Sequence, residues 1–205
     1  MTPEEALVVL EHQVQACQAC ILGNSRHQAV FGEGNPRSRL MFIGEGPGKE
    51  EDRQGRPFVG PAGQLLDQML KAMGMNRHEH VYIANVVKCR PPGNRVPDPA
   101  EITACHSYLA RQIDLINPAI VVLLGSTALK ALFGPHRRIT GARGQWIGHN
   151  DRWWMPTYHP AALLRNPALK RDVWTDLKHV LDQYRLLVDP QHDTPHYPLS
   201  SGKSP

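Results

Sequence analysis

Residues 39–48 read RLMFIGEGPG, an apolar run that leads directly into a glycine-rich turn. A short apolar run that is closed by a turn is typical of a strand buried on both faces of a sheet. We therefore predict a buried strand over Arg39–Gly44, with the turn at its carboxyl end. The same pattern predicts three further strands, at Val81–Val87, Ala119–Leu124 and Trp153–Tyr158.

Helical patterns alternate with these strands. Thr2, Pro3 and Glu5 form the signature of a capped helix start, and we expect this helix to run to about Gln15. Further helices are predicted at Gly63–Met73, Ala100–Ile116, Ser126–Leu132 and Asn166–Leu186. Strands that alternate with helices imply an α/β fold, in which helices cover both faces of a mostly parallel sheet.

The composition is that of one ordinary globular domain, with 205 residues of which 41% are hydrophobic and 20% charged. We predict a single domain over residues 1–186 and a disordered tail over 187–205, where the chain becomes rich in proline, histidine and serine. No apolar run reaches membrane-spanning length, and the acidic N-terminus does not resemble a signal peptide, so we expect a cytoplasmic protein. A net charge of +4 permits an anionic partner without requiring one.

The chain contains four cysteines, arranged as a close pair, Cys17 and Cys20, and a wider pair, Cys89 and Cys105. Disulfides are disfavoured in the reducing cytosol. Four thiolates suit either a tetrahedral zinc ion or an iron–sulfur cluster, and the spacing alone leaves these two as comparable alternatives. A shared site would clamp the N-terminal helix to the loop and helix after the second strand; a redox role is also open.

Ligands of such folds bind beyond the carboxyl ends of the strands, and the turn after Gly44 lies there. This turn has neither the GxxxxGK[ST] nor the GxGxxG pattern, and its carboxylates, Glu45, Glu50, Glu51 and Asp52, would repel a pyrophosphate. A carboxylate here suits a reaction in which positive charge develops or water is activated, as in glycosidic cleavage. A solvated acidic face is the alternative for Glu50 and Asp52.

Two more side chains are expected near this turn. Phe58 lies between rigid proline and glycine positions and could offer a flat ring for stacking, although a lone Phe is more often a core residue. Asn85 lies inside an apolar strand, and its amide has both a donor and an acceptor edge. Such an amide could form hydrogen bonds with the edge of a nucleic-acid base. A structural asparagine with partners inside the protein is an equal alternative.

The segment after the fourth strand carries the last candidates. His159 stands at the carboxyl end of that strand, where it could donate a hydrogen bond to a leaving group. Leu163, Leu164 and Arg165 follow it and could form an apolar wedge with a phosphate-binding neighbour, or the first turn of a core helix.

Several segments together resemble the uracil-DNA glycosylase superfamily, and most closely its family 4, the iron–sulfur-containing enzymes of bacteria and archaea. They are GEGPGKEED (44–52), GRPFVGPAGQLL (55–66), NVVKCRPPGNRVP (85–97) and HPAALLRNP (159–167), together with the cysteines in order and spacing. The resemblance covers roughly Leu7–Leu186. It implies a three-layer α/β/α sandwich around a short, mostly parallel four-stranded sheet. It also implies hydrolysis of the N-glycosidic bond of deoxyuridine in DNA, by base flipping and without strand cutting.

The resemblance further implies roles for individual residues. The backbone of Glu45, Gly46 and Pro47 would line the uracil pocket. Phe58 would stack on the base, Asn85 would read its edge, and His159 would hydrogen-bond the departing base.

Glu45 is also expected to position water or stabilise the sugar cation. Other branches carry Asp where this chain has Gly46, which leaves the water-activating group open. Glu51 is expected to occupy the place of thymine's methyl group and so exclude thymine. The resemblance gives the cysteines one [4Fe-4S] cluster, with Cys17, Cys20, Cys89 and Cys105 as its ligands.

Two other functions are alternatives to hydrolysis. Some iron–sulfur relatives trap uracil-DNA covalently through a His in a basic loop, but the corresponding loop, Arg90–Pro97, contains no His, which favours turnover. An electron carrier is supported only by the cysteines. The expected partner is uracil-containing DNA, single- or double-stranded, bound by a nucleoid-associated monomer; nothing in the sequence supports a sliding-clamp partner.

Overall fold

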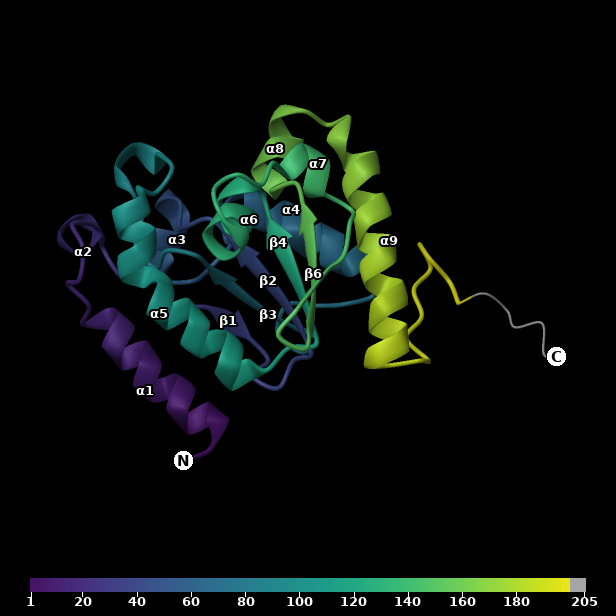
Figure 1. Ribbon diagram of the computed structural model, residues 1–205, viewed down its shortest axis with the longest axis horizontal. Coiled ribbons are helices and arrows are strands. Elements are labelled where there is room, and N and C mark those ends of the chain that lie inside the picture. Colours follow the sequence, from purple (N-terminus) through teal and green to yellow (C-terminus); the bar gives the residue numbers. More distant parts are fainter. Residues whose placement is uncertain (200–205) are drawn as a thin grey trace.

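The run that opens the glycine-rich turn forms strand β2 (Leu40–Gly44), which lies inside a six-stranded sheet with all of its residues buried. The computed structural model describes residues 1–199, and its strand order is β1-β3-β2-β4-β6-β5 (Figure 1). Strands β3 (Val81–Asn85), β2, β4 (Ile120–Leu124) and β6 (Arg152–Thr157) are parallel neighbours. The predicted α/β class and mostly parallel sheet are therefore confirmed.

The predicted number of four strands is wrong, because two short edge strands complete the sheet. β1 (Glu33–Gly34) pairs antiparallel with β3, and β5 (Ile147–His149) pairs antiparallel with β6. Each is two or three residues long and largely uncovered. A segment this short has no apolar alternation of its own, so only its pairing partner reveals it.

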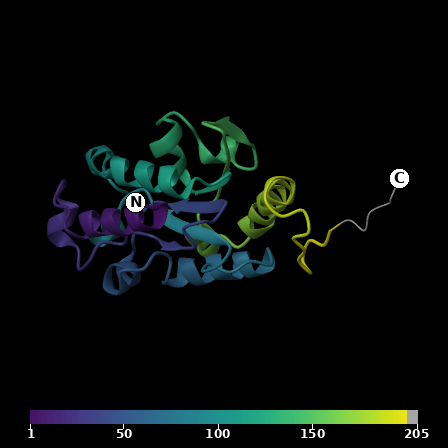
Figure 2. The ribbon, with the colours of Figure 1, turned by 90° about the horizontal axis from the view of Figure 1, so that it is seen from below.

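Helices cover both faces of the sheet, which confirms the three-layer sandwich. Met41 and Ile43 pack in a cluster with α1 (Pro3–Gln15), α5 (Pro99–Ile116) and α6 (Ser126–Phe133). Leu40 and Phe42 point the other way, into a cluster with α4 (Pro61–Ala72), α8 (Pro160–Arg165) and α9 (Leu169–Leu187). Figure 2 shows the sheet edge-on between α5 and α4.

Three short α-helices and one 3-10 helix complete the described chain: α2 (Leu22–Ser25), α3 (Lys49–Gln54), α7 (Ile139–Ala142) and η1 (Pro92–Asn94). The predicted start of α1 is confirmed, since Thr2 and Glu5 form a reciprocal capping box. Within residues 1–199, no helix combines the length and the apolar character that a membrane span requires.

The segment after α9 does not fit the predicted disordered tail. The side chain of Thr194 is buried and donates to the carbonyl of Ala72 at 2.8 Å, and Nε2 of His192 lies 2.7 Å from the carbonyl of Met73. These contacts fix residues 188–199 against the end of α4. Composition does not reveal such contacts, because these polar side chains find backbone partners far away in the sequence, and the domain end at residue 186 stays a prediction. The remainder of the predicted tail, residues 200–205, lies outside the described residues.

Candidate active site

A cleft of about 1220 Å³ opens at the carboxyl ends of the parallel strands. It is larger than the roughly 300–1,000 Å³ of a pocket for one small ligand. The loops after β2, β3, β4 and β6 line it, and α6, α7 and α8 gather at this end of the molecule (Figure 1). The cleft brings together most of the site residues predicted from the sequence, namely Glu45, Gly46, Pro47, Glu51, Phe58, Asn85, His159 and Arg165.

Glu45 lies half-buried in the turn after β2, with its carboxylate held by a residue that sequence reasoning missed. The hydroxyl of Thr127, in the first turn of α6, donates to Oε2 of Glu45. Thr127 follows the carboxyl end of β4, so its position in the topology was the available signal. The contact fixes the direction of a carboxylate that lines the cleft.

Phe58 has an unusual backbone, with φ at +53° in the left-handed region. Its ring is 5% exposed and stacks against the ring of His159, with centroids 5.5 Å apart and 29° between the planes. Gly63, in the first turn of α4, permits this conformation, because a Cβ there would lie 1.8 Å from the carbonyl oxygen of Phe58.

Gly44 is the last residue of β2 and lies next to the side chains of Phe58 and Asn85. An added Cβ would lie 2.5 Å from Cζ of Phe58 and 2.6 Å from Oδ1 of Asn85. Only glycine therefore allows the aromatic ring and the amide to meet over the end of the strand.

Asn85 is the last residue of β3 and is 2% exposed. Its Oδ1 is buried and has no hydrogen-bond partner among residues 1–199. An unpaired buried acceptor costs about 1–3 kcal/mol, so native proteins seldom retain one without a use. Asn85 thus presents a free acceptor beside the cleft.

His159 caps the N-terminus of α8. Its Nδ1 accepts a hydrogen bond from the backbone N–H of Ala161 at 3.1 Å, which assigns the proton of the neutral ring to Nε2. Burial, helped by the charge of Arg165 and opposed by that of Glu51, lowers the pKa of His159 to about 4. At neutral pH the ring is therefore an uncharged N–H donor.

Glu51 lies on α3, and its side chain borders the cleft. Its Oε1 accepts the backbone N–H groups of Val59 and Gly60, both at 2.8 Å. The carboxylate thus binds the loop that carries Phe58, a role that the sequence did not suggest. The steric exclusion of thymine by Glu51 stays a prediction.

The three residues of the predicted wedge, Leu163, Leu164 and Arg165, lie in different surroundings. Leu163 is 2% exposed and packs in the core with α4 and α9, so it is not available to intercalate. Leu164 is 48% exposed, and Arg165 lines the cleft. Successive residues of a helix point about 100° apart, so adjacent leucines on α8 face different surroundings.

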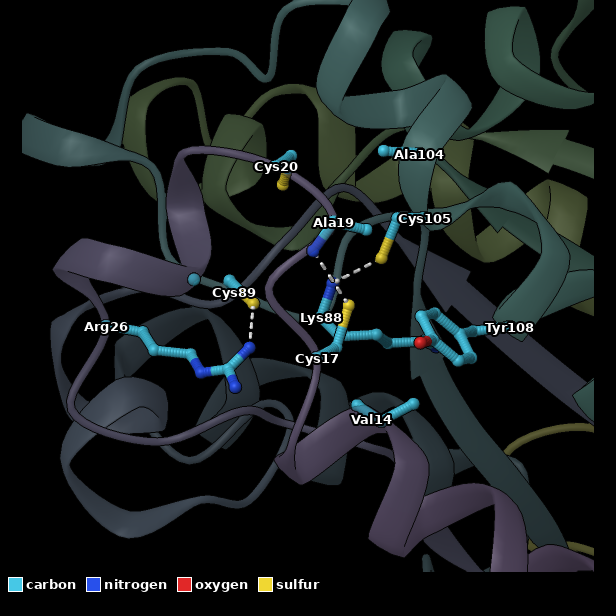
Figure 3. Close-up of a pocket in the computed structure, with 11 residues that line it drawn as sticks. Val14, Cys17, Ala19, Cys20, Arg26, Lys88, Cys89, Ala104, Cys105 and Tyr108 are labelled. Carbon is cyan, nitrogen blue, oxygen red and sulfur yellow. Dashed lines mark hydrogen bonds between the residues drawn. The ribbon is translucent and has the colours of Figure 1, made fainter.

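The four cysteines line a second pocket, away from the cleft, and none of them forms a disulfide (Figure 3). Cys17 and Cys20 come from the segment after α1, Cys89 from the loop after β3, and Cys105 from α5. Apolar atoms dominate the lining, including those of Val14 and Tyr108. Within residues 1–199, no three Cys, His, Asp or Glu side chains come close enough to hold a single metal ion.

Several N–H groups are directed at the sulfurs of this pocket. Nη1 of Arg26 donates to Sγ of Cys89 at 2.9 Å, and the backbone N–H of Lys88 donates to Sγ of Cys105 at 3.3 Å. Burial raises the pKa of Cys89 and raises that of Cys105 to about 11. Donors of this kind favour thiolates, the form in which cysteine binds metal, so the residues fit a thiolate-ligated metal group.

Lys88 connects the two sites. Its side chain is 1% exposed, and Nζ donates to the carbonyl of Asn85 at 2.8 Å and to Oε1 of Gln112 at 2.5 Å. Sequence reasoning missed Lys88, although a lysine within the apolar run 81–89 was a usable signal. The lysine ties the end of β3 to α5, the helix that carries Cys105.

Comparison with known proteins points to one group of enzymes. The sequence profile of the Uracil DNA glycosylase superfamily matches residues 31–178. A Type-4 uracil-DNA glycosylase of Thermotoga maritima is 48% identical over 183 residues, which cover 86% of this chain and 94% of that protein. A Type-4 uracil-DNA glycosylase of Sulfurisphaera tokodaii is 44% identical over 202 residues, covering 94% and 90%. A Type-5 uracil-DNA glycosylase of Pyrobaculum aerophilum is 30% identical over 146 residues, covering 63% and 64%.

Proposed function

This chain belongs to the uracil-DNA glycosylase superfamily and to its type-4 branch, and from that premise we propose that it is a uracil-DNA glycosylase. It is a monofunctional hydrolase that cleaves the N-glycosidic bond of deoxyuridine in DNA, releasing uracil and leaving an abasic site for base excision repair. One observation carries the proposal beyond the similarity. The unpartnered acceptor of Asn85 and the neutral donor of His159 border the same cleft.

Recognition follows from the hydrogen-bonding edge of uracil. The N3–H group of uracil donates to Oδ1 of Asn85, which satisfies that buried acceptor. Cytosine presents an acceptor at N3 and would leave Oδ1 facing another lone pair, so Asn85 discriminates against it. Phe58 stacks on the flipped ring, and the backbone of Glu45, Gly46 and Pro47 closes the pocket.

Leaving-group stabilisation is assigned to His159. Uracil departs as an anion, and Nε2–H of His159 donates to the carbonyl oxygen on which charge grows. The low pKa of the ring keeps it neutral, so it acts as a fixed hydrogen-bond donor and keeps its proton. A fixed donor of this type contributes about 10²–10³ in rate.

Glu45 is assigned to the sugar side of the reaction. Its carboxylate, oriented by the hydroxyl of Thr127, stabilises the positive charge that develops on the sugar and positions the attacking water. Gly46 supplies no carboxylate of its own, so this chain depends on Glu45 for both tasks.

DNA contacts beyond the base are assigned to α8. Leu164 is the exposed apolar side chain that enters the space left by the flipped nucleotide, and Arg165 binds a neighbouring phosphate. Leu163 is not part of this assignment, because it is buried in the core.

Exclusion of thymine is assigned to Glu51, which borders the cleft. The test compares thymine release by the parent with that by Glu51→Gln, which keeps the size of the side chain, and by Glu51→Gly, which removes it. Steric exclusion predicts thymine release by Glu51→Gly alone. Equal release by all three proteins would show that Glu51 acts only by holding the loop at residues 59–60.

A [4Fe-4S] cluster is the proposed occupant of the second pocket, held by the four cysteines named above. The proposal is supported by four thiols around one pocket, by the N–H donors directed at their sulfurs, and by the type-4 relatives. When bound, the cluster cross-links the segment after α1 to the loop after β3 and to α5. Iron content and visible absorbance of anaerobically purified protein test it, and stoichiometric zinc without iron would overturn it.

The activity is assigned to one domain over residues 1–186, acting as a monomer in the cytoplasm beside the chromosome. The substrate is DNA, and the relatives come from bacteria and archaea, which supports this assignment. No sliding-clamp partner is proposed.

The deciding experiment is incubation with an oligonucleotide that carries one uracil, followed by alkali to cleave abasic sites. The parent is expected to produce the cleaved strand, and Asn85→Ala and His159→Ala are the controls. Cleavage no greater than in these variants would refute the proposal. A complex with uracil-DNA that survives denaturant would instead identify a covalently trapping relative.

A further inference from the structure

The loop that carries Phe58 is held in a conformation that its own sequence disfavours. A bulky residue in the left-handed region is strained and persists only where its surroundings determine it. Phe58 adopts this region with φ at +53°, and its ring lies against both His159 and the end of β2. The contacts that impose this backbone therefore also determine where the ring lies.

Two buried side chains of opposite charge bind this loop from its two sides. Arg77, in the connection between α4 and β3, donates from Nη1 to the carbonyl of Phe58 at 2.8 Å and from Nη2 to the carbonyl of Pro57. Glu51 accepts the N–H groups of the next two residues, as described above. Four consecutive residues, 57–60, are thus bound through their main chain.

Two carboxylates lie beside the guanidinium of Arg77, although its Nε makes no hydrogen bond within residues 1–199. Its side chain is 9% exposed, Nε lies 3.3 Å from Oε1 of Glu33, and Nη1 lies 3.4 Å from Oδ2 of Asp67. Glu33 in turn receives two hydrogen bonds from Arg56, at 2.6 and 2.8 Å. A planar guanidinium can address two carbonyls and a carboxylate at once, whereas the ammonium of a lysine is a single point.

We propose that Arg77 is a positioning residue that sets the plane of the Phe58 ring in the uracil cleft. Arg77 does not line the cleft and acts only through the peptide groups of residues 57 and 58. The inference rests on the proposed function, since it assumes that Phe58 stacks on the base. It adds a positioning residue that lies outside the four segments, 44–52, 55–66, 85–97 and 159–167, that carry the resemblance.

Arg185 provides a matched control. Its side chain is 11% exposed, it donates to the carbonyls of His192 and Tyr197 at 2.9 and 2.5 Å, and it pairs with Asp182 at 3.6 Å. Arg77 and Arg185 therefore resemble each other in burial and bonding, but only Arg77 binds the Phe58 loop. Arg77→Met and Arg185→Met should lose similar thermal stability.

The expected difference lies in excision. Loss of ring placement should lower kcat/KM on uracil-DNA about 100-fold in Arg77→Met, the effect of roughly 1 Å of misplacement. Arg185→Met should stay near the parent. Binding of free uracil, measured by equilibrium dialysis, should weaken in parallel in Arg77→Met alone. Affinity for uracil-free DNA should be unchanged in both variants, a result that general unfolding would not give.

Lysine variants keep the test decisive if a methionine variant does not fold. Arg77→Lys retains the charge and one carbonyl contact, so it should fall between the parent and Arg77→Met, with Arg185→Lys as its control. Equal excision and equal uracil binding in the Arg77 and Arg185 variants would overturn the inference. Failure of the proposed function is seen separately, as a parent protein that releases no uracil.

Discussion

The uracil cleft and the four-cysteine pocket lie at the two ends of the segment Asn85–Cys89. They differ in whether their buried acceptor atoms have hydrogen-bond partners within the protein. At the cleft end, Oδ1 of Asn85 is buried without a partner. At the pocket end, Sγ of Cys89 already accepts a hydrogen bond from Arg26. A site that must bind and release a substrate keeps unsatisfied groups, whereas a site that holds a permanent group satisfies them within the protein.

The two regions are nevertheless mechanically joined. Lys88 lies between them: its backbone N–H donates a hydrogen bond to Sγ of Cys105, and its ammonium donates one to the carbonyl of Asn85. Loss of the proposed metal group should therefore reach the cleft through Lys88 and Asn85, and through Pro91 and Ile102, which line the cleft and lie close in sequence to Cys89 and Cys105. The difference between the regions can be tested from each side.

The largest effect is expected in the cleft. His159→Ala removes the fixed donor to the departing base, so kcat should fall by about 10²–10³. Iron content should stay close to that of the parent, whereas loss of the α8 cap, about 1 kcal/mol, should lower Tm by roughly 2–4 °C. His12→Ala, on the exposed face of α1, is the control and should retain full activity. A parent-like rate in His159→Ala would mean that leaving-group stabilisation lies elsewhere.

The next effect is expected in the cysteine pocket. Cys105→Ala should lose iron and the visible absorbance. A tightly bound group contributes at least about 2.7 kcal/mol, the value for a ligand at 100 times its Kd, so Tm should drop by roughly 5–10 °C. Excision per folded molecule should change far less than in His159→Ala. Complete loss of excision in a folded, iron-free variant would contradict a purely structural pocket.

A smaller effect is expected where β2 meets the cleft. Gly44→Ala forces a Cβ against the ring of Phe58 and the amide of Asn85, and overpacking of this kind costs about 1–3 kcal/mol. Chemical denaturation should show this loss together with weaker binding of free uracil. Gly141→Ala in α7 is the control, because its Cβ would meet nothing within 4 Å. Equal stability of the two variants would mean that the ring and amide can move without cost.

The smallest effect is expected from pH. The pKa of His159 is 6.5 in the unfolded chain and about 4 in the folded protein. The ring therefore stays neutral as pH falls, and kcat/KM should remain level down to about pH 5, where a normal histidine would already be protonated. A decline centred on pH 6.5 would show that the ring is charged in the free enzyme.

The same shift has a signed consequence for stability. Because the folded pKa is depressed, the unfolded chain binds the proton more readily between pH 6.5 and about 4. The stabilising contribution is thus present above pH 6.5 and is lost as pH falls towards 4. The free energy of unfolding should decline less over this window in His159→Gln than in the parent.

Much of the fold was predictable because local patterns specify it. The four parallel strands and the long helices follow from apolar runs and from helical spacing, which act over a few residues. β3 ends at Asn85, two residues before the predicted end at Val87, because the chain leaves the sheet there. The residues that follow, Lys88 and Cys89, line the second pocket. Periodicity in a sequence does not show where such a departure begins.

The candidate site was predictable in its members and not in their partners. Glu45, Asn85 and His159 stand at or just after the carboxyl ends of strands, so topology alone brings them to one end of the sheet. Phe58 follows α3 in the connection after β2. Thr127, Arg77 and Lys88 were missed, because each acts on a residue at least three positions away and, for two of them, in another element. The sequence could not tell Leu163 from Leu164, because the two leucines differ in burial, which depends on what surrounds them.

From its residues alone, the chain could be assigned a buried strand and glycine-rich turn in 39–48, an alternation of strands and helices, a shared site of four cysteines and a family. Each of these depends on residue types and on short spacings. Other features follow only from the folded chain: the strand order, the free acceptor of Asn85 and the neutral ring of His159. The same holds for the hydrogen bonds by which Arg77 and Glu51 hold the loop around Phe58. These features depend on burial and on contacts between distant segments, which exist only once the chain has folded.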